Sequence, residues 1–281
     1  KQELIRLGSF DDIDAAMLSH ATSKQSDGDL AVGGTSLGHL VKYVEFFGLA
    51  SHAAGAPQDG INALKAANIA MMAMDSQRES FEDKDKVRVH GILTAGGTSV
   101  NSIPSIAKLE WRVRGRTIDV VNKINIKIDR SIKAGAMAMG AKVRIRSIAG
   151  NLPMLQNKHM NNIYLNNAEN IVGKNNVVLH PDDQSGGSTD MGDLSQILPI
   201  IHPRSGGAEG TGHGNNYFIK DYEKSVINPA KAMATTIIDL LWPDDMQINE
   251  VINNHKPNYS ISEYIALQNK RMGNDFNDYT S

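Results

Sequence analysis

The sequence contains no cysteine among its 281 residues. Disulfide bridges, thiolate metal ligands and a cysteine nucleophile are therefore excluded. The chain also lacks a surplus of positive charge, because 29 Lys and Arg residues face 31 Asp and Glu residues and the net charge is -2. Proteins that hold nucleic acid by neutralising phosphates normally carry a basic surplus or stripe, so we expect no nucleic-acid partner.

Long apolar runs are missing as well. The longest ones, such as residues 66–74, are too short to span a bilayer, and the first residues lack the apolar core of a signal peptide. We therefore expect no membrane association. A cysteine-free, mildly acidic chain suits the cytoplasm, and a chain of this length buries enough surface to fold.

Residues 40–150 show the pattern strand, helix, strand, strand, helix, strand. Helical spacing of apolar residues runs through 57–78, and apolar and polar residues alternate in 87–93 and 107–114. Thr117 can cap the second helix. The order β-α-β-β-α-β predicts a ferredoxin-like domain, with one sheet face or edge free to pair with another chain.

The flanking segments, residues 1–39 and 151–242, alternate strands and helices in a way that indicates an α/β layer. We therefore predict the α/β fold class, with one α/β domain interrupted by the ferredoxin-like domain. The tail, residues 243–281, is rich in asparagine, and we assign it no function.

Histidines are the natural transition-metal ligands of a chain without cysteine. His20 ends an apolar run, as expected at the carboxyl end of a buried strand, where α/β sheets place ligands. His213 lies in a loop of small residues that leaves a site open. Taken singly, each is more often a surface or hydrogen-bonded histidine. The single His-x-Asp sequence, residues 180–182, favours an ordinary turn over a metal pair.

Five further polar residues are candidates for a site. His52 lies between a strand and a helix, among small residues that let a substrate or another chain approach. Arg114 ends the polar face of its strand, and its guanidinium suits a carboxylate, although such a residue is usually solvated. Asn101 lies on a turn between two strands. Ser188 and Asp190 belong to a turn-prone loop that could cap a helix, and Asp190 could instead orient a ligand.

Four segments, in this order, carry a resemblance to a known family: residues 10–20, 51–60, 97–104 and 188–213. With a ferredoxin-like insert between them, they resemble the dinuclear-zinc metallopeptidase family of aminoacylases, carboxypeptidase G and p-aminobenzoyl-glutamate hydrolase. The likeness extends from about Gly8 to Trp242 and is greatest to the p-aminobenzoyl-glutamate hydrolase branch.

The resemblance implies a metal-dependent amidohydrolase or peptidase that cleaves an amide bond next to a carboxylate. The substrate would be an N-acyl amino acid, aminobenzoyl-glutamate or a small peptide. His20 and His213 would be ligands of two divalent metal ions, zinc or manganese. Two such ions can polarise an amide carbonyl and supply hydroxide near neutral pH. We therefore expect these two imidazoles to converge in the fold.

The resemblance also implies a homodimer formed through the ferredoxin-like lid domain. His52 would reach a site in the neighbouring protomer and stabilise the oxyanion of the tetrahedral intermediate. Asn101 and Arg114 would bind the substrate carboxylate or carbonyl. Ser188 and Asp190 would shape the site around metal and substrate.

Two departures from the family pattern leave an alternative open. Family members carry a His-x-Asp ligand pair, a bridging acidic ligand and a Glu-Glu pair ahead of the segment that contains His20. This chain has no Glu-Glu pair, and residues 213–217 differ from the usual sequence after the ligand histidine. We expect the amino-terminal part of the catalytic domain to be missing. The alternative is a non-catalytic dimerisation or binding fragment without a complete metal site.

Overall fold

The computed structural model describes residues 1–280 and their side chains, except the side chains of residues 181–184. The chain forms two compact units, each built from separate segments. The first unit comprises Lys1–Ser36 and Met154–Tyr264, and the second comprises Leu37–Pro153 and Ile265–Ser281. The sequence analysis placed the borders between the two domains after residue 39 and after residue 150.

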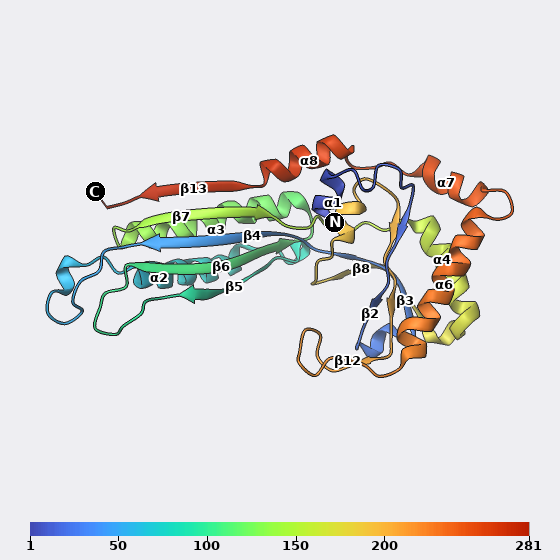
Figure 1. Ribbon diagram of the computed structural model, residues 1–281, viewed down its shortest axis with the longest axis horizontal. Helices are drawn as coiled ribbons and strands as arrows, with labels where there is room; N and C mark the ends of the chain where they lie inside the picture. Colours follow the sequence, from blue (N-terminus) through green and yellow to red (C-terminus); the bar gives the residue numbers. More distant parts are fainter. Residues whose placement is uncertain (281) are drawn as a thin grey trace. The chain divides into compact units, whose positions relative to one another are not determined.

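The first unit is a mixed α/β structure (Figure 1). Its helices and strands are α1 (Gln2–Arg6), β1 (Ala16–Met17), β2 (His20–Ala21), β3 (Leu30–Ser36), α4 (Lys158–Val172), β8 (Val177–Ser185), α5 (Met191–Leu194), β9 (Ile200–Ile201), β10 (Arg204–Ser205), β11 (Ala208–Glu209), β12 (Phe218–Ile219), α6 (Asn228–Leu241) and α7 (Met246–Asn254). Its largest sheet has the order β2-β10-β3-β8, and β1 pairs separately with β9.

Helices α4 and α6 pack together against β3. In α4 the buried residues Met160, Tyr164 and Ala168 recur every four positions, so that they form one apolar face that joins the core around Leu30 and Val32. The helix begins where the Asn157 side chain accepts a hydrogen bond from the Met160 amide at 3.0 Å. The helical periodicity of the sequence therefore determines which face of α4 covers the sheet.

The second unit has the predicted ferredoxin-like order. It contains β4 (Gly38–Phe47), α2 (Ala63–Ser76), β5 (Arg88–Ala95), β6 (Ile106–Gly115), α3 (Ile118–Ala138), β7 (Lys142–Ala149) and β13 (Gly273–Asp278). All neighbours in the sheet β13-β7-β4-β6-β5 are antiparallel. The predicted α/β class with a ferredoxin-like insert is confirmed.

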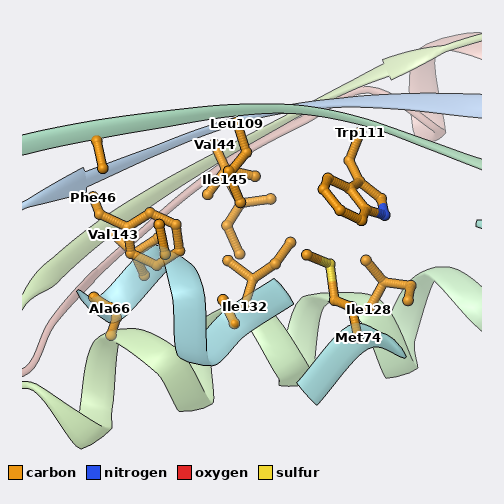
Figure 2. Close-up of a cluster of buried hydrophobic side chains, with 14 of the residues drawn as sticks. Val44, Phe46, Ala66, Met74, Leu109, Trp111, Ile128, Ile132, Val143 and Ile145 are labelled. Carbon is orange, nitrogen blue, oxygen red and sulfur yellow. The ribbon is translucent and has the colours of Figure 1, made fainter. Parts of the chain in front are cut away.

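One face of this sheet packs on α2 and α3 (Figure 2). Leu109, Trp111 and Val113 point into the core, as the alternation in the sequence predicts. The Thr117 side chain accepts a hydrogen bond from the Val120 amide at 3.2 Å and caps α3, which confirms that prediction. Gly135 allows the two helices to approach closely, because a Cβ atom there would lie 2.4 Å from the Ala66 carbonyl oxygen of α2.

The tail is more structured than its sequence suggests. Residues 243–264 belong to the first unit, whereas β13 adds a fifth strand to the second unit by pairing with β7. Its sequence is rich in Gly, Asn and Asp, which are depleted in strands. Contacts made by its side chains stabilise the strand in spite of this low strand propensity. Asp275 pairs with Lys133 of α3 at 2.6 Å, and Phe276 lies beside the Arg144 guanidinium. Helix α8 (Ile261–Lys270) leads into this strand.

No helix in the described part of the chain is long and apolar enough to cross a membrane.

A buried lysine ties α3 to the sheet. The Lys42 side chain is fully buried; its Nζ lies 2.5 Å from Asp129 Oδ1 and donates a hydrogen bond to Ser147 Oγ at 2.9 Å. Burial lowers the pKa of Lys42, and the Asp129 carboxylate opposes that shift. The charged lysine therefore depends on its aspartate partner.

Replacing the two partners should have unequal effects on stability. We expect Asp129→Asn to lower the free energy of unfolding by about 2–3 kcal/mol, because it leaves a buried ammonium group unpaired. Lys42→Met keeps the length of the side chain without the charge, and should change stability by no more than about 1 kcal/mol. Urea denaturation of both variants measures this, and a larger loss in Lys42→Met than in Asp129→Asn would contradict it.

Candidate active site

A pocket of about 300 Å³ lies in the first unit. It is lined by His20, Ala21, Thr22, Lys24, Asp27, Ser36, Met154, Ser185, Gly186, Gly187, Ser188, Thr189, His202 and Arg204. The pocket thus contains two of the site residues predicted from the sequence, His20 and Ser188.

A parallel backbone ladder places His20 in this pocket. The amides of alternate residues from Ala16 to Thr22 donate to the carbonyl oxygens of Pro199, Ile201, Pro203 and Ser205 at 2.7–3.2 Å. His20 begins β2 opposite Arg204, and its side chain is exposed. It therefore does not end a buried strand as expected, because β1 and β2 are only two residues long and separated by a break.

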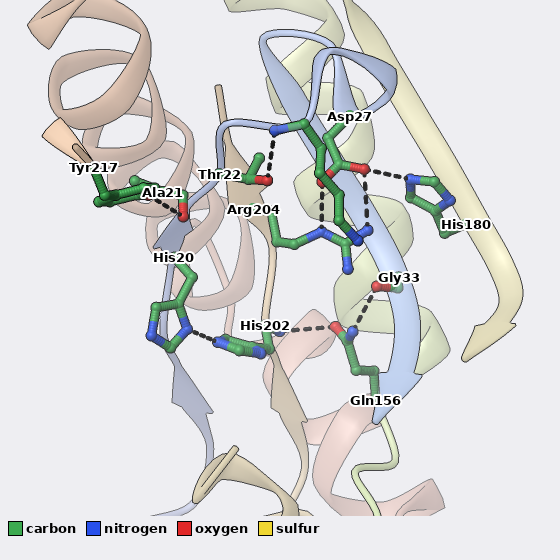
Figure 3. A network of polar contacts seen from close by, with 11 residues as sticks. His20, Ala21, Thr22, Asp27, Gly33, Gln156, His180, His202, Arg204 and Tyr217 are labelled. Atoms are coloured by element: carbon green, nitrogen blue, oxygen red, sulfur yellow. Dashed lines mark hydrogen bonds and ion pairs between the residues drawn. The ribbon is translucent and has the colours of Figure 1, made fainter. Parts of the chain in front are cut away.

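The imidazole of His20 meets that of His202 (Figure 3). His20 Nδ1 lies 2.7 Å from His202 Nε2, so one of these nitrogens donates a hydrogen bond and the other accepts it. The other ring nitrogen of His20 points away from His202 (Figure 3). Burial, the His20 ring and the Arg204 guanidinium lower the pKa of His202 to about 4, so its ring is neutral at pH 7.

Gln156 holds the backbone next to this histidine pair. Its side-chain oxygen accepts a hydrogen bond from the His202 amide at 2.7 Å. Its side-chain nitrogen donates to the carbonyl oxygens of Gly33 and Gly34 at 2.8 and 2.9 Å. Gly33 and Gly34 both have φ of +82°, and the pairing of β3 with β8 shifts here. One amide side chain therefore joins the irregular part of β3 to His202.

A buried carboxylate lies at the other side of the pocket. Asp27 is 2% exposed, and Arg204 Nε lies 3.1 Å from its Oδ2. His180 Nε2 lies 3.3 Å from Asp27 Oδ1. The turn predicted at residues 180–182 falls within β8 (Val177–Ser185), at the place where its pairing with β3 is irregular: His180 pairs with Gly33, and the next pair is Gln184 with Thr35. The side chain of Asp182 lies outside the described residues.

His213 lies in the exposed turn between β11 and β12, with a positive φ of 65°. The Tyr217 hydroxyl of this turn donates to the Ala21 carbonyl oxygen at 3.0 Å, next to His20 (Figure 3). The loop that carries His213 is therefore anchored beside the strand that carries His20. Convergence of the two imidazoles stays a prediction.

Ser188 and Asp190 lie at the start of the short helix α5. Asp190 precedes the helix and forms an ion pair with Lys1 Nζ at 2.8 Å. Burial raises the pKa of the Asp190 carboxyl, but the Lys1 ammonium outweighs burial, so the pKa falls below its usual value. Of the two residues, Ser188 lines the pocket.

In the second unit, His52 and Asn101 lie on adjoining loops. The Ala53 amide donates to the Asn101 carbonyl oxygen at 2.9 Å. His52 Nδ1 accepts hydrogen bonds from the amides of Ala54 and Gly55 at 3.2 and 2.8 Å. A neutral His52 therefore carries its hydrogen on Nε2, which makes that atom a donor.

Arg114 lies at the opposite end of the same sheet. The loop of Asn101 precedes Ile106, where β6 begins, whereas Arg114 is one residue from its end. At the rise of an antiparallel strand, Ile106 and Arg114 are about 27 Å apart. The structure brings His52 and Asn101 together and separates both from Arg114.

Comparison with curated proteins finds relatives over most of the chain. It is 30% identical over 254 residues to the Xaa-Arg dipeptidase of Mus musculus, covering 86% of this chain and 56% of the relative. It is 25% identical over 250 residues to a p-aminobenzoyl-glutamate hydrolase component of Escherichia coli (strain K12), covering 85% and 55%. The chain is similar to these amidohydrolases and peptidases over most of its own length. The resemblance read from the sequence is thereby confirmed.

A solved structure shows the same fold. The aminobenzoyl-glutamate utilization protein from Klebsiella pneumoniae matches with a TM-score of 0.62 at 19% identity, covering 85% of this chain and 57% of that one. A search of protein-family profiles finds no match. The chain spans about half the length of the curated relatives it matches.

The described residues do not fit a metal site of their own. Among them, no group of three or more His, Asp or Glu side chains could hold a metal ion. His20 has one ring nitrogen occupied by His202, which leaves one nitrogen as a ligand. The described part of the chain therefore offers single imidazole donors, and these do not amount to a complete ligand set for the expected pair of metal ions.

The sequence patterns assigned no role to His202, Asp27 or Gln156. His202 lies in residues 188–213, a segment that carries the family resemblance. Its position in that motif was the signal by which the sequence could have identified it as a site residue. Asp27 and Gln156 have no such signal, because their partners lie far away in the sequence.

Gln156 gives a direct test of this arrangement. Gln156→Glu replaces the amide donor by an oxygen that faces two carbonyl oxygens, so we expect the free energy of unfolding to fall by about 2 kcal/mol. The matched control Gln25→Glu lies at an exposed position and should stay within about 0.5 kcal/mol of the parent protein. Equal stability of the two variants in urea denaturation would show that the Gln156 bonds are dispensable.

Proposed function

We propose that the protein containing this chain is an amidohydrolase or peptidase that cleaves an amide bond next to a carboxylate. The observation that carries this proposal is the similarity, over most of the chain, to a dipeptidase and an aminobenzoyl-glutamate hydrolase. Both names describe substrates in which an amide bond adjoins an amino-acid carboxylate. An N-acyl amino acid, aminobenzoyl-glutamate or a small peptide is the proposed substrate, and the cytoplasm the proposed compartment.

The pocket that His20 lines in the first unit supports this proposal. It combines an exposed imidazole, which His202 orients, with a loop of Gly and Ser residues that leaves room for a small substrate. His20 would present its second ring nitrogen as a metal ligand. Arg204 is not proposed to bind substrate, because its guanidinium already forms an ion pair with the buried Asp27 carboxylate.

A metal belongs to the proposal for the whole protein. His20 and His213 are the proposed imidazole ligands, and two zinc or manganese ions would polarise the amide carbonyl. The remaining donors would come from outside the described residues, from a further segment or another chain.

The separation within the second unit supports a homodimer. A small substrate cannot span the roughly 27 Å between Arg114 and the far end of β6, where the loops of His52 and Asn101 lie. The three residues can therefore serve one reaction only if two copies of this unit contribute to each site. We propose that Arg114 of one protomer binds the substrate carboxylate and that His52 and Asn101 of a second copy approach the reacting carbonyl.

The alternative is a non-catalytic dimerisation or binding module. It is favoured by the missing third metal ligand among the described residues. The two proposals differ in a measurable way, because hydrolysis and bound metal belong only to the first.

Mixing two inactive variants of the whole protein tests the proposal. We expect His52→Ala and His20→Ala each to abolish hydrolysis of aminobenzoyl-glutamate and of dipeptides. The mixture should regain roughly a quarter of the activity, because half of randomly paired dimers are mixed and each holds one intact site. His159→Ala, at a helix position paired with Gln247, is the matched control and should keep full activity.

The same experiment separates the possible failures. If the parent protein holds no metal after dialysis and hydrolyses neither substrate, the binding-module alternative replaces the enzyme. If the parent is active but the mixture stays inactive, the function stands and the role of His52 in the partner's site is wrong.

A further inference from the structure

A second pocket, of about 450 Å³, lies in the second unit and shares no residue with the candidate active site. The residues that line it all fall within 74–89, which comprise the end of α2, the connection of residues 77–87 and the start of β5. Small-molecule sites typically measure about 300–1,000 Å³, so this pocket has the size of a site for a small ligand. We call it the α2–β5 pocket.

Two contacts fix the connection that forms one wall of the pocket. Lys127 Nζ of α3 donates hydrogen bonds to Ser80 Oγ at 2.8 Å and to the Ser80 carbonyl oxygen at 3.1 Å. The Arg116 amide, one residue beyond β6, donates to the Asp85 carbonyl oxygen at 2.9 Å. The wall is therefore held in place before a ligand arrives, which reduces the ordering that binding costs.

Part of the lining is apolar. Met74 is 1% exposed and belongs to the hydrophobic core of the unit (Figure 2). Phe81, Val87 and Val89 are partly buried and pack against the same core. An apolar group of a ligand that covered these side chains would remove further apolar surface from water.

Two acidic and two basic side chains in the lining leave one another unpaired. Asp75 and Arg78 are three residues apart, as are Asp83 and Lys86, and opposite charges at that spacing on a helix normally attract. In the part of the chain that the structure describes, none of these four exposed side chains forms an ion pair. Helix α2 passes into a 3₁₀ helix between the first two residues, and Lys86 has a φ of 50°, so regular helical geometry joins neither couple.

The other two charged residues that line the pocket have partners. Glu82 pairs with Lys84 at 2.6 Å and with Lys123 at 3.6 Å. Arg88 Nη1 donates a hydrogen bond to the Val87 carbonyl oxygen at 2.9 Å. The charges available to a ligand are therefore two carboxylates and two cationic groups.

The position of Asp75 has no benefit for the helix that carries it. Asp75 lies in the last turn of α2, where the negative end of the helix dipole disfavours a carboxylate. That turn contains no basic residue. A cationic group bound beside Asp75 would offset this unfavourable interaction.

We propose that the α2–β5 pocket binds a free α-amino acid with an apolar side chain. The ammonium group of the ligand pairs with Asp75 and Asp83, and its carboxylate pairs with Arg78 and Lys86. Its side chain covers the apolar part of the lining. A simple anion or cation would leave one pair of these charges without a partner, whereas a zwitterion satisfies both. Binding requires no hydrolysis, so its test is independent of the proposed function.

Calorimetric titration of the full chain with leucine tests the proposal. We expect saturable binding. Three analogues each lack one recognised group: 4-methylpentanoate has no ammonium, 3-methylbutylamine has no carboxylate, and glycine has no apolar side chain. Each should bind roughly tenfold more weakly than leucine, because each leaves one part of the pocket without a partner. None of the three analogues contains an amide bond, so hydrolysis does not interfere with the titration.

Two variants assign the charges. Asp75→Asn should weaken the binding of leucine and 3-methylbutylamine by roughly tenfold and leave 4-methylpentanoate unchanged. Arg78→Gln should weaken leucine and 4-methylpentanoate to a similar degree and leave 3-methylbutylamine unchanged. The matched controls Glu79→Gln and Lys65→Gln change exposed residues that do not line the pocket, and should bind leucine as the parent does.

Thermal unfolding without the ligand gives a second readout. The melting temperature of Asp75→Asn should not fall, because the variant removes a carboxylate from the negative end of a helix dipole. A lower melting temperature for both Asp75→Asn and Arg78→Gln would overturn the proposal, since the two residues would then stabilise the fold itself. Absence of saturable leucine binding, analogues that bind as tightly as leucine, or an equal loss in Glu79→Gln would overturn it as well.

Discussion

The parallel pairing of residues 16–22 with residues 199–205 is the interaction on which the candidate site depends. Its backbone bonds place His20 against His202 and Arg204, which follow it by more than 180 residues in the chain. Neither histidine could orient the other without this ladder. Because these hydrogen bonds join backbone atoms, the backbone pairing, and not the side chains, sets the position of His20 at the start of β2.

In the second unit, too, the pairing of the strands decides where the candidate functional residues lie. Antiparallel register puts His52 and Asn101 at one end of the sheet and Arg114 at the other, and no rotation of side chains closes that distance. Register also places Arg88 opposite Arg114. The unit therefore separates its candidate functional groups between its two ends, which is why the proposed reaction requires two copies.

Much of the fold was predictable because its signals are local. The alternation that ends at Arg114, the cap at Thr117 and the apolar stripe of α3 each need only neighbouring residues, and they identified the ferredoxin-like unit. The family motifs likewise pointed to His20 and to the loop of Ser188, both of which line the pocket. Strand β13 escaped prediction because its residues disfavour a strand, and only the edge of β7 makes it one.

The sequence by itself determined the fold class, the order of the elements and the resemblance to a family, since periodicity and motif order are properties of contiguous residues. Only the tertiary structure decided that His202 is the partner of His20, that Gln156 joins His202 to β3, and that Arg88 faces Arg114. The physical reason is that each of these contacts depends on which strands pair and in which register. A shift of one residue would turn the side chains to the opposite face, and no local pattern specifies that choice.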